Sequence, residues 1–442
     1  MELVRLGQWR AWLREADPVL VQGTIWAFVL NAAGMFLGFL NQALLARTLG
    51  SDGFGLYLYV VGWANLAGLV CALEFSHASV RYVSEYAAKG AWGSLVGFIR
   101  RSRQLVTGST VACSLVALTV VLIAGPKDDD RRYAWIAACA LLPVASLIQL
   151  ESSLLLGLKR LRSSLAPFTV LRPLVFGVGL LACWWLYGSE VDTGDAVLVQ
   201  TVATGASLGL TVWYLRRVMP KPALRAAPVY HTREWVVASS HFVAIAIAQL
   251  VLSTQGDTLL VGLLLGTRKA GLYGAASQFA MLVAFGSNAI MVIAQPLIAD
   301  LHARRELRKS RIAQQIVGLA LLASIPVYLG LVVFGRPLLR VYGEQFVPMY
   351  PVLVVLAISH LISGVFGMLL GYLFTMTAHQ ELAMKIIGAS ALLKLVLAVV
   401  LTLWLGLMGM AIAAALATLV RSVALGMAAR NLVLDIAPPA IG

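Results

Sequence analysis

The sequence predicts an all-α polytopic membrane protein of about twelve transmembrane helices, in two six-helix lobes related by a pseudo-two-fold axis along the membrane normal. Of its 442 residues, 60% are hydrophobic and only 12% are charged, and the mean hydropathy is +0.86. Apolar runs of about 20 to 28 residues alternate with short charged breaks, a pattern typical of transmembrane helices. A nine-residue motif also occurs once in each half of the chain.

Each apolar run is expected to form one span. The first six expected spans are Val19–Leu45, Phe54–Val80, Leu105–Ala124, Tyr133–Leu156, Leu165–Tyr187 and Asp195–Leu215. The second six are Trp235–Leu263, Leu272–Ala299, Ile312–Phe334, Pro348–Met376, Glu381–Leu405 and Gly409–Arg430. The breaks between them are glycine-rich, basic or acidic: Gly50, Arg81–Arg103, Asp128–Asp130, Lys159–Arg162, Arg216–Arg233, Gly266, Arg304–Arg311 and Gly406–Gly409. These runs leave no room for a soluble catalytic domain, so the chain is not expected to be an enzyme.

The repeated motif explains the expected division into lobes at residues 1–220 and 221–442. LGSDGFGLY (Leu49–Tyr57) recurs 216 residues later as LGTRKAGLY (Leu265–Tyr273), with five of nine residues identical. Both copies fall between the first and second helix of a six-helix set. Because six is even, a duplicated unit keeps its orientation, and such architectures bind substrate between halves that rock about it. The motif is expected to end a helix at Gly50 and Gly266, open the next at Gly55 and Gly271, and place Tyr57 and Tyr273 in aromatic belts.

The charges indicate the orientation in the membrane. The net charge of +14 would suit nucleic acid, but the basic residues lie between spans, so the membrane explains them better. Lys and Arg concentrate in alternate breaks, which predicts cytoplasmic N and C termini. Residues 1–15 place Leu6, Trp9 and Leu13 on one helical face and predict an interfacial helix on the inner leaflet. The four cysteines fall inside spans with no disulfide or metal spacing, and no cofactor is expected.

Ionisable residues inside spans are candidate functional residues because burying a charge in lipid is costly. Lys394 lies far from both ends of its span and requires a polar cavity or a buried partner, whereas Arg421 lies closer to an end. Arg172 and Glu151 lie at similar depths on neighbouring helices. Two interpretations of that pair remain open: a structural salt bridge, or Arg172 facing a central cavity. These basic residues are candidates for binding substrate, and Glu151 for ion coupling.

A second group of candidates lies on helices two, seven and ten. Glu74, His77 and Arg81 are spaced to share one helix face, which lines a cavity or pairs with a neighbouring helix. Glu74 is a candidate for ion coupling and Arg81 for binding substrate. His360, in mid-span, is either a core histidine or a substrate ligand. Asp257 follows the polar run Ser253–Gly256, which predicts a loosened helix, and its repeat-equivalent residue is Asn41. Asp257 therefore suits a proton or cation site, with a packing hydrogen bond as the alternative.

Several stretches in order along the chain resemble the multidrug/oligosaccharidyl-lipid/polysaccharide (MOP) exporter superfamily, in particular its polysaccharide-transporter branch of O-antigen flippases. The stretches are ARTLGSDGFGLY, RYVSEY, QGDTLLVGLLLGTRKAGLYGAA, YGEQFVPMYPVLVVLAIS and GLMGMAIAAALATLV. EFSH (Glu74–His77) departs from the family's acid and glycine-containing step. The resemblance implies a multi-pass protein of the bacterial cytoplasmic (inner) membrane.

The leading hypothesis is a flippase that moves a lipid-linked, polyprenyl-pyrophosphate oligosaccharide from the inner to the outer leaflet by alternating access, for cell-surface polysaccharide export such as lipopolysaccharide. Basic residues inside the spans would stabilise the phosphate charge in a low dielectric. The alternative is a cation-coupled small-molecule or multidrug exporter of the same superfamily. A membrane enzyme would need a sizeable loop with paired carboxylates. The expected partners are the lipid-linked oligosaccharide, membrane lipids, a polysaccharide polymerase and export machinery; the chain is expected to be a monomer and to bind no nucleic acid.

Overall fold

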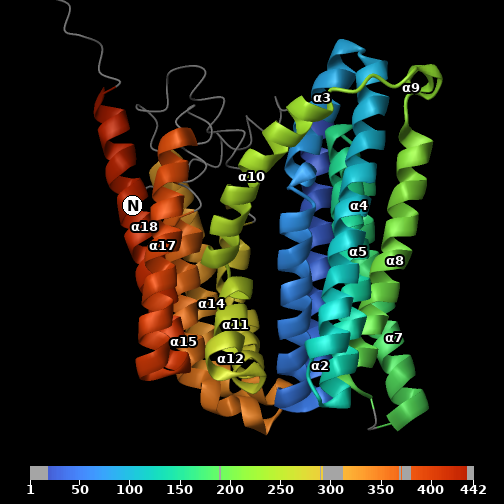
Figure 1. Cartoon of the computed structure of the whole chain (residues 1–442). Helices are drawn as coiled ribbons and strands as arrows, with labels where there is room; N and C mark the ends of the chain where they lie inside the picture. The colour runs from blue at the N-terminus through green and yellow to red at the C-terminus, as the bar shows by residue number, and fades with distance from the viewer. Residues whose placement is uncertain are drawn as a thin grey trace, which may run out of the picture. The chain divides into compact units, whose positions relative to one another are not determined.

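A computed structural model gives the fold (Figure 1), and the structure describes residues 18–188, 191–288, 290–291, 312–367, 370 and 380–435. The expected interfacial helix at residues 1–15 and parts of the expected spans eight and ten lie outside these ranges. All regular secondary structure in the described ranges is helical, and ten of these segments are long and apolar enough to cross a membrane. The all-α, multi-pass class is thus confirmed, while the twelve helices in two symmetric lobes stay a prediction.

The chain divides into two compact units. The N-terminal unit comprises Ile25–Ile247 with Thr267–Gly271, and the C-terminal unit comprises Met1–Thr24, Ala248–Gly266 and Leu272–Gly442. Helix α5 is central to the N-terminal unit, where it packs against α3, α4, α6 and α8 (Figure 1). The helices of the N-terminal unit are α2 (Pro18–Cys71), α3 (Phe75–Lys89), α4 (Trp92–Ala124), α5 (Asp129–Gly157), α6 (Leu161–Ala166), the π-helix η1 (Pro167–Leu171), α7 (Arg172–Tyr187), α8 (Thr193–Val218), α9 (Lys221–Arg225) and α10 (Thr232–Leu252).

Helix α2 holds two of the expected spans. It is assigned 54 residues, which would extend to about 80 Å at 1.5 Å per residue, far beyond the ~30 Å apolar core of a bilayer. Gly50 interrupts it with φ 64° and ψ −173°, a conformation open almost only to glycine. Asn41 before this break and Tyr57 after it both contact α7, at Gly177 and Phe176 respectively. The chain therefore folds back at Gly50, as the motif predicts.

The second copy of the motif makes the same break. Gly266 separates α11 (Thr254–Leu265) from α12 (Thr267–Ala280) with φ 93° and ψ 163°. The helices resume directly after Gly50 and Gly266, so the prediction that Gly55 and Gly271 open them is wrong by one turn. These two glycines pack against each other instead: a Cβ on Gly271 would lie 2.8 Å from the Gly55 Cα. The close approach leaves no room for a side chain.

The second expected span ends earlier than predicted. Helix α2 stops at Cys71, and the chain turns through Leu73 and Glu74, both with positive φ, before α3 begins. Beyond this turn an aromatic cluster fixes α3, α4 and the start of α10. Trp235 is fully buried, packs edge-on against Phe98 at 5.2 Å between ring centres, and donates its Nε1–H to the Tyr86 hydroxyl at 2.9 Å. The start of α10 is thus anchored within the N-terminal unit.

The C-terminal unit is built around α18. Helix α18 (Leu407–Asp435) packs against α17 (Gln380–Leu405), α15 (Tyr350–Ile362) and α11 (Figure 1). Helix α14 (Ile312–Tyr342), the 3-10 helix η3 (Glu344–Met349) and the π-helix η4 (Ser363–Gly367) complete its described elements.

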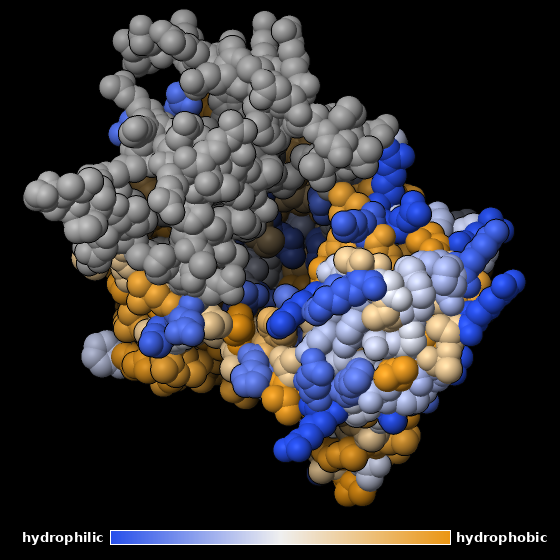
Figure 2. All heavy atoms as spheres, turned by 90° about the horizontal axis from the view of Figure 1, so that it is seen from above, coloured by the Kyte–Doolittle hydropathy of each residue, from blue (hydrophilic) through white to orange (hydrophobic). Residues whose placement is uncertain are grey.

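The surfaces of the helices fit a lipid environment. Large apolar side chains are exposed on their flanks, including Ile123, Trp185 and Trp404, each more than 80% exposed. Figure 2, viewed from above, shows hydrophilic side chains gathered on the end of the N-terminal unit that carries α3 and α9. The exposed basic residues of α3, α4, α8 and α9 are Arg81, Lys89, Arg100, Arg216, Arg217, Lys221 and Arg225. This basic end matches the breaks that the sequence assigns to the cytoplasm.

Candidate functional site

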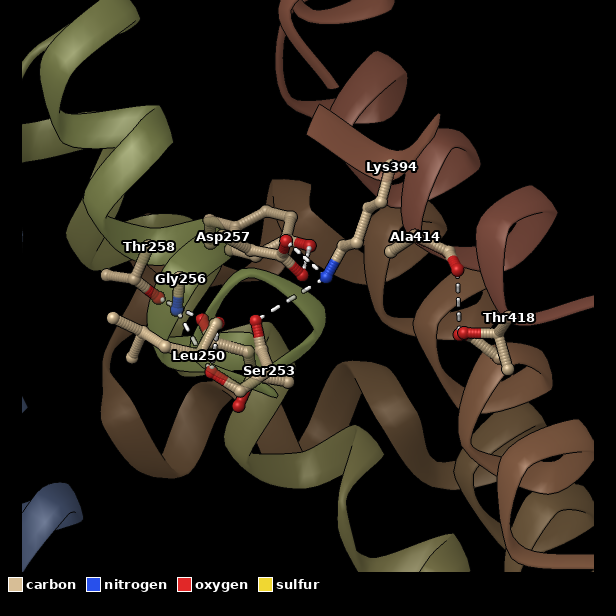
Figure 3. A network of polar contacts seen from close by, with 11 residues as sticks. Leu250, Ser253, Gly256, Asp257, Thr258, Lys394, Ala414 and Thr418 are labelled. Carbon is tan, nitrogen blue, oxygen red and sulfur yellow. Dashed lines mark hydrogen bonds and ion pairs between the residues drawn. The ribbon is translucent and has the colours of Figure 1, made fainter. Parts of the chain in front are cut away.

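The expected seventh span is broken at Ser253, between α10 and α11 (Figure 3). Ser253 has extended backbone angles and caps α11: its Oγ accepts a hydrogen bond from the Gly256 N–H at 3.2 Å. A Cβ on Gly256 would strike the Leu250 carbonyl, so only glycine allows the chain to turn this tightly. The polar run Ser253–Gly256 therefore loosens the helix as predicted. Broken helices of this kind form ion and substrate sites in transporters.

Asp257 and Lys394 form a buried ion pair beside this break (Figure 3). The Lys394 ammonium on α17 lies 2.7 Å from Asp257 Oδ1 and 3.5 Å from the Ser253 carbonyl oxygen. The other carboxylate oxygen accepts a hydrogen bond from the Tyr273 hydroxyl on α12 at 3.1 Å. Of the two alternatives for Lys394, a polar cavity or a buried partner, the structure has the buried partner.

All three side chains of the C-terminal ion pair and its hydrogen-bond donor are buried, which makes the pair important for stability. Asp257 is 1% exposed, Lys394 3% and Tyr273 fully buried. A buried charge is tolerable only when it is paired and hydrogen-bonded, and removing one partner of such a pair costs about 3–5 kcal/mol. Tyr273 was not expected here: the prediction that Tyr57 and Tyr273 lie in aromatic belts is wrong, because both are buried. Their identical 16-residue separation from Asn41 and Asp257 was the sequence signal that could have found them.

Two further candidates lie in the C-terminal unit. His360 on α15 lies within electrostatic range of Lys394, and its neighbour Ser359 donates to the Thr418 hydroxyl on α18 at 3.2 Å. Arg421 on α18 donates to the Ser363 hydroxyl at 3.1 Å, at the start of the π-helix η4. Short π-helices inside α-helices are frequent at functional sites. The structure thus brings His360 near the Asp257–Lys394 pair, while Arg421 has a neutral partner.

Arg172 in the N-terminal unit is a half-buried cation of a different kind. It follows directly on the π-helix η1, its guanidinium stacks 4.0 Å from the centre of the Phe168 ring, and the Tyr57 hydroxyl lies within range of its charge. Among the residues that the structure describes, no carboxylate lies within ion-pair distance of it. Cation–π contact stabilises the guanidinium without neutralising it.

Asn41 occupies the position in the N-terminal unit that Asp257 has in the C-terminal unit. The Asn41 Nδ2 donates a hydrogen bond to the carbonyl oxygen of Pro173 at 2.7 Å, and Pro173 directly follows Arg172 in the chain. The two units thus offer two sets of residues for comparison, from the first, second and fifth expected helix of each half. The 216-residue offset of the motif aligns Asn41 with Asp257 and Tyr57 with Tyr273, whereas Arg172 and Lys394 lie 222 residues apart. These sets, here called the N-site and the C-site, are Asn41, Tyr57 and Arg172, and Asp257, Tyr273 and Lys394.

Glu151 does not pair with Arg172. Both of its carboxylate oxygens accept from the Arg103 guanidinium on α4, one of them at 2.6 Å, and the carboxylate is almost fully buried. Helix α4 begins at Trp92, so Arg103 lies on its continuous surface beside α5, whereas the sequence placed it in a break. No signal in the sequence identified this partner. The interpretation of Glu151 and Arg172 as a salt bridge is therefore wrong.

Glu74, His77 and Arg81 do not form one buried face. Glu74 is buried in the turn before α3, whereas His77 and Arg81 are exposed. The Glu74 carboxylate lies 2.7 Å from the His77 Nδ1, and this hydrogen bond raises the pKa of the imidazole above its ordinary value. His77 stacks on Phe242 of α10, 5.9 Å between ring centres. Among the described residues, no group of histidine, cysteine or acidic side chains could hold a metal.

Comparisons with known proteins agree with this architecture. The sequence profile of the family described as "polysaccharide biosynthesis protein" matches residues 20–302. A relative from Haloferax volcanii, named "Probable low-salt glycan biosynthesis flippase Agl15", is 22% identical over 416 residues, which cover 91% of this chain and 82% of that protein.

Two solved structures share the fold. An inward-facing multidrug resistance MATE transporter of the MOP superfamily superposes with a TM-score of 0.70 at 14% identity, covering 94% of this chain and 99% of the other. The lipid II flippase MurJ, in an inward closed conformation, gives a TM-score of 0.69 at 13% identity, covering 94% and 88%. The resemblance noted in the sequence to MOP exporters of the polysaccharide branch is therefore confirmed.

Proposed function

Because this chain belongs to the polysaccharide biosynthesis protein family, as a transporter of the MOP superfamily and not an enzyme, we propose that it is a flippase for a lipid-linked oligosaccharide. The substrate would carry a polyprenyl tail, a pyrophosphate and a polar glycan. The tail stays in lipid while the head group crosses between leaflets by alternating access.

One observation carries the proposal: the candidate carboxylates have cationic or histidine partners, and two of the three candidate cations inside the spans do not have carboxylate partners. Asp257 pairs with Lys394, Glu151 with Arg103, and Glu74 with His77. Within the described part of the chain, Arg172 and Arg421 form no ion pair. The uncompensated charge inside the spans is therefore positive, which suits a phosphate-bearing substrate because arginine binds phosphate with two parallel hydrogen bonds.

The same observation weighs against the alternative, a cation-coupled exporter of small molecules. Such a protein would offer a carboxylate to its cationic substrate, whereas Asp257 is already neutralised by Lys394. Arg172, Arg421 and His360 would bind the substrate's anionic head, with Lys394 joining them when Asp257 releases it. Glu151 and Glu74, proposed from the sequence for ion coupling, are better explained as structural partners of Arg103 and His77.

The setting follows from the charge distribution. The basic end of the N-terminal unit would face the cytoplasm, with both termini on that side of a bacterial cytoplasmic membrane. Asp52, whose side chain is 72% exposed, would face outward. A cysteine introduced there should react with an impermeant thiol reagent from the outside only. The protein would work as a monomer beside a polysaccharide polymerase and its export machinery.

The test is flipping in proteoliposomes of a fluorescent oligosaccharide linked to a polyprenyl pyrophosphate, scored by its protection from an impermeant quencher. Arg172→Gln should slow flipping about 100-fold, the loss of one strong charge-assisted contact. Arg172→Lys keeps the charge, so its flipping rate should lie between those of the wild type and Arg172→Gln. The alternative function would be favoured by two results together. The wild type would flip no glycan, and it would export a lipophilic cation at a rate that Arg172→Gln does not change.

A further inference from the structure

The C-site resembles an anion-binding site that is already filled by the chain's own carboxylate. The Lys394 ammonium is 97% buried and its two described oxygen contacts, Asp257 Oδ1 and the Ser253 carbonyl, both come from the break in the seventh span. A buried ammonium without an anion would be unstable, so Asp257 supplies the anion internally. Any other anion that reaches Lys394 has to displace this carboxylate.

The N-site holds a cation that has no carboxylate partner among the described residues. At the repeat-equivalent position Asn41 is neutral and uses its amide to bond the Pro173 carbonyl, and Arg172 is left with Phe168 and Tyr57 around it. Replacing a carboxylate by an amide is chemically close to protonating it, because both changes remove one negative charge and leave a similar shape. The neutral Asn41, which the 216-residue offset aligns with Asp257, therefore has the charge that Asp257 would have after it takes up a proton.

We infer that Lys394 is a second binding site for a phosphate or pyrophosphate anion, and that protonation of Asp257 opens it. The proton would come from the aqueous phase and bind a carboxylate oxygen; Lys394 would remain an ammonium and pass from Asp257 to the phosphate oxygens. Release of the anion would return Lys394 to Asp257 and expel the proton. The inference rests on the proposed function for its ligand class, and it would give that function a coupling to protons.

The other titratable and charged groups around the pair allow this exchange. Tyr273 on α12 donates to Asp257 Oδ2 and can keep doing so when Oδ1 carries the proton. His360 on α15 lies within electrostatic range of Lys394 and would be the nearest additional donor for a bound anion. Helix α18 also packs on α11, and its Arg421 is held by Ser363. The described neighbours thus include no second carboxylate that could replace Asp257 as counter-ion.

The experiment measures binding of inorganic pyrophosphate by calorimetry to the full chain in phosphatidylcholine nanodiscs, with every protein carrying Arg172→Gln so that the N-site is silent. At pH 8, Asp257→Asn should raise the affinity about tenfold, within the usual range for coupled sites. The matched control is Asp257→Asn with Lys394→Gln, which should lose the gain. No gain, or a gain that survives without Lys394, would overturn the inference.

A second measurement needs no change at Asp257 and covers the case in which that variant fails to fold. Titrations in buffers of different ionisation enthalpy should show about one more proton taken up per pyrophosphate bound when Lys394 is present than in Lys394→Gln. Equal proton uptake would refute the coupling. Adding phosphatidylglycerol to the discs tests the other source of phosphate, a lipid headgroup. If phosphatidylglycerol weakens pyrophosphate binding only when Lys394 is present, the site binds a bulk lipid headgroup instead. Because none of these measurements involves transport, a failed flipping assay leaves their outcome intact.

Discussion

The N-site and the C-site differ in whether the cation has a carboxylate partner. In the C-site the acid Asp257 neutralises Lys394 at 2.7 Å, and in the N-site the amide Asn41 leaves Arg172 with aromatic neighbours. One unit thereby holds a closed ion pair and the other a cation with unused binding capacity. The difference teaches that a single carboxylate decides whether a cation inside a span is neutralised by its own chain or can bind another anion.

The largest expected effect is the loss of the C-site cation. Lys394→Ala leaves Asp257 buried and unpaired, so the folded state should lose about 3–5 kcal/mol of stability, measured by denaturant titration in detergent. The matched change in the N-site, Arg172→Ala, leaves no carboxylate behind and should cost only about 1 kcal/mol through its contact with Phe168. Equal losses would mean that the two sites do not differ in charge compensation. Asp257→Asn combined with Lys394→Ala should recover part of the loss.

The glycine contact tests whether the two motif copies play equivalent parts. Alanine at Gly55 or at Gly271 forces a Cβ into the opposing backbone, and each variant should lose about 1–3 kcal/mol. Gly108→Ala in α4 is the control, because no other atom lies within 4 Å of the added Cβ. Thermal unfolding of the three variants provides the comparison. If only one of the two glycine-to-alanine variants loses stability, the two motif copies do not contribute equally to this contact.

A smaller change converts the N-site toward the C-site. Asn41→Asp introduces a carboxylate beside Arg172, and binding of inorganic pyrophosphate should weaken about tenfold as this carboxylate competes for the guanidinium. Asn41→Ala loses the same hydrogen bond to Pro173 without adding a charge, so it isolates the electrostatic part. Unchanged binding by Asn41→Asp would show that the residue 41 side chain does not reach Arg172.

The smallest effect concerns a pair that only the N-terminal unit has. Glu74 accepts from His77 beyond the end of the second span, whereas the repeat-equivalent of Glu74 is Ile290. Because the folded pKa of His77 is raised, its contribution to stability is fully present below the ordinary value of about 6.5 and disappears as pH rises through the raised value. Glu74→Gln should return the pKa toward 6.5 in an NMR titration of the His77 ring. An unchanged titration would rule out Glu74 as the cause.

The sequence by itself determined the all-helical, multi-pass class and the glycine turns of the two motif copies. Span length is a local property, because a run of apolar residues must match the thickness of the bilayer, and the breaks at Gly50 and Gly266 need a backbone conformation that is local to glycine. The polar run Ser253–Gly256 likewise predicted the helix break at Ser253. The turn at Leu73 and Glu74 was missed, since neither residue favours positive φ and only surrounding contacts hold it there.

Only the tertiary structure decided which charges meet. Glu151 and Arg172 lie at similar depths on neighbouring helices, yet Glu151 faces Arg103 on α4 and Arg172 faces Phe168. Lys394 and Asp257 are far apart in the chain, and depth alone showed that Lys394 needed either a polar cavity or a buried partner, without identifying Asp257. The reason is rotational: hydropathy fixes how far along its helix a residue lies, whereas the packing of one helix against the next fixes the direction in which its side chain points.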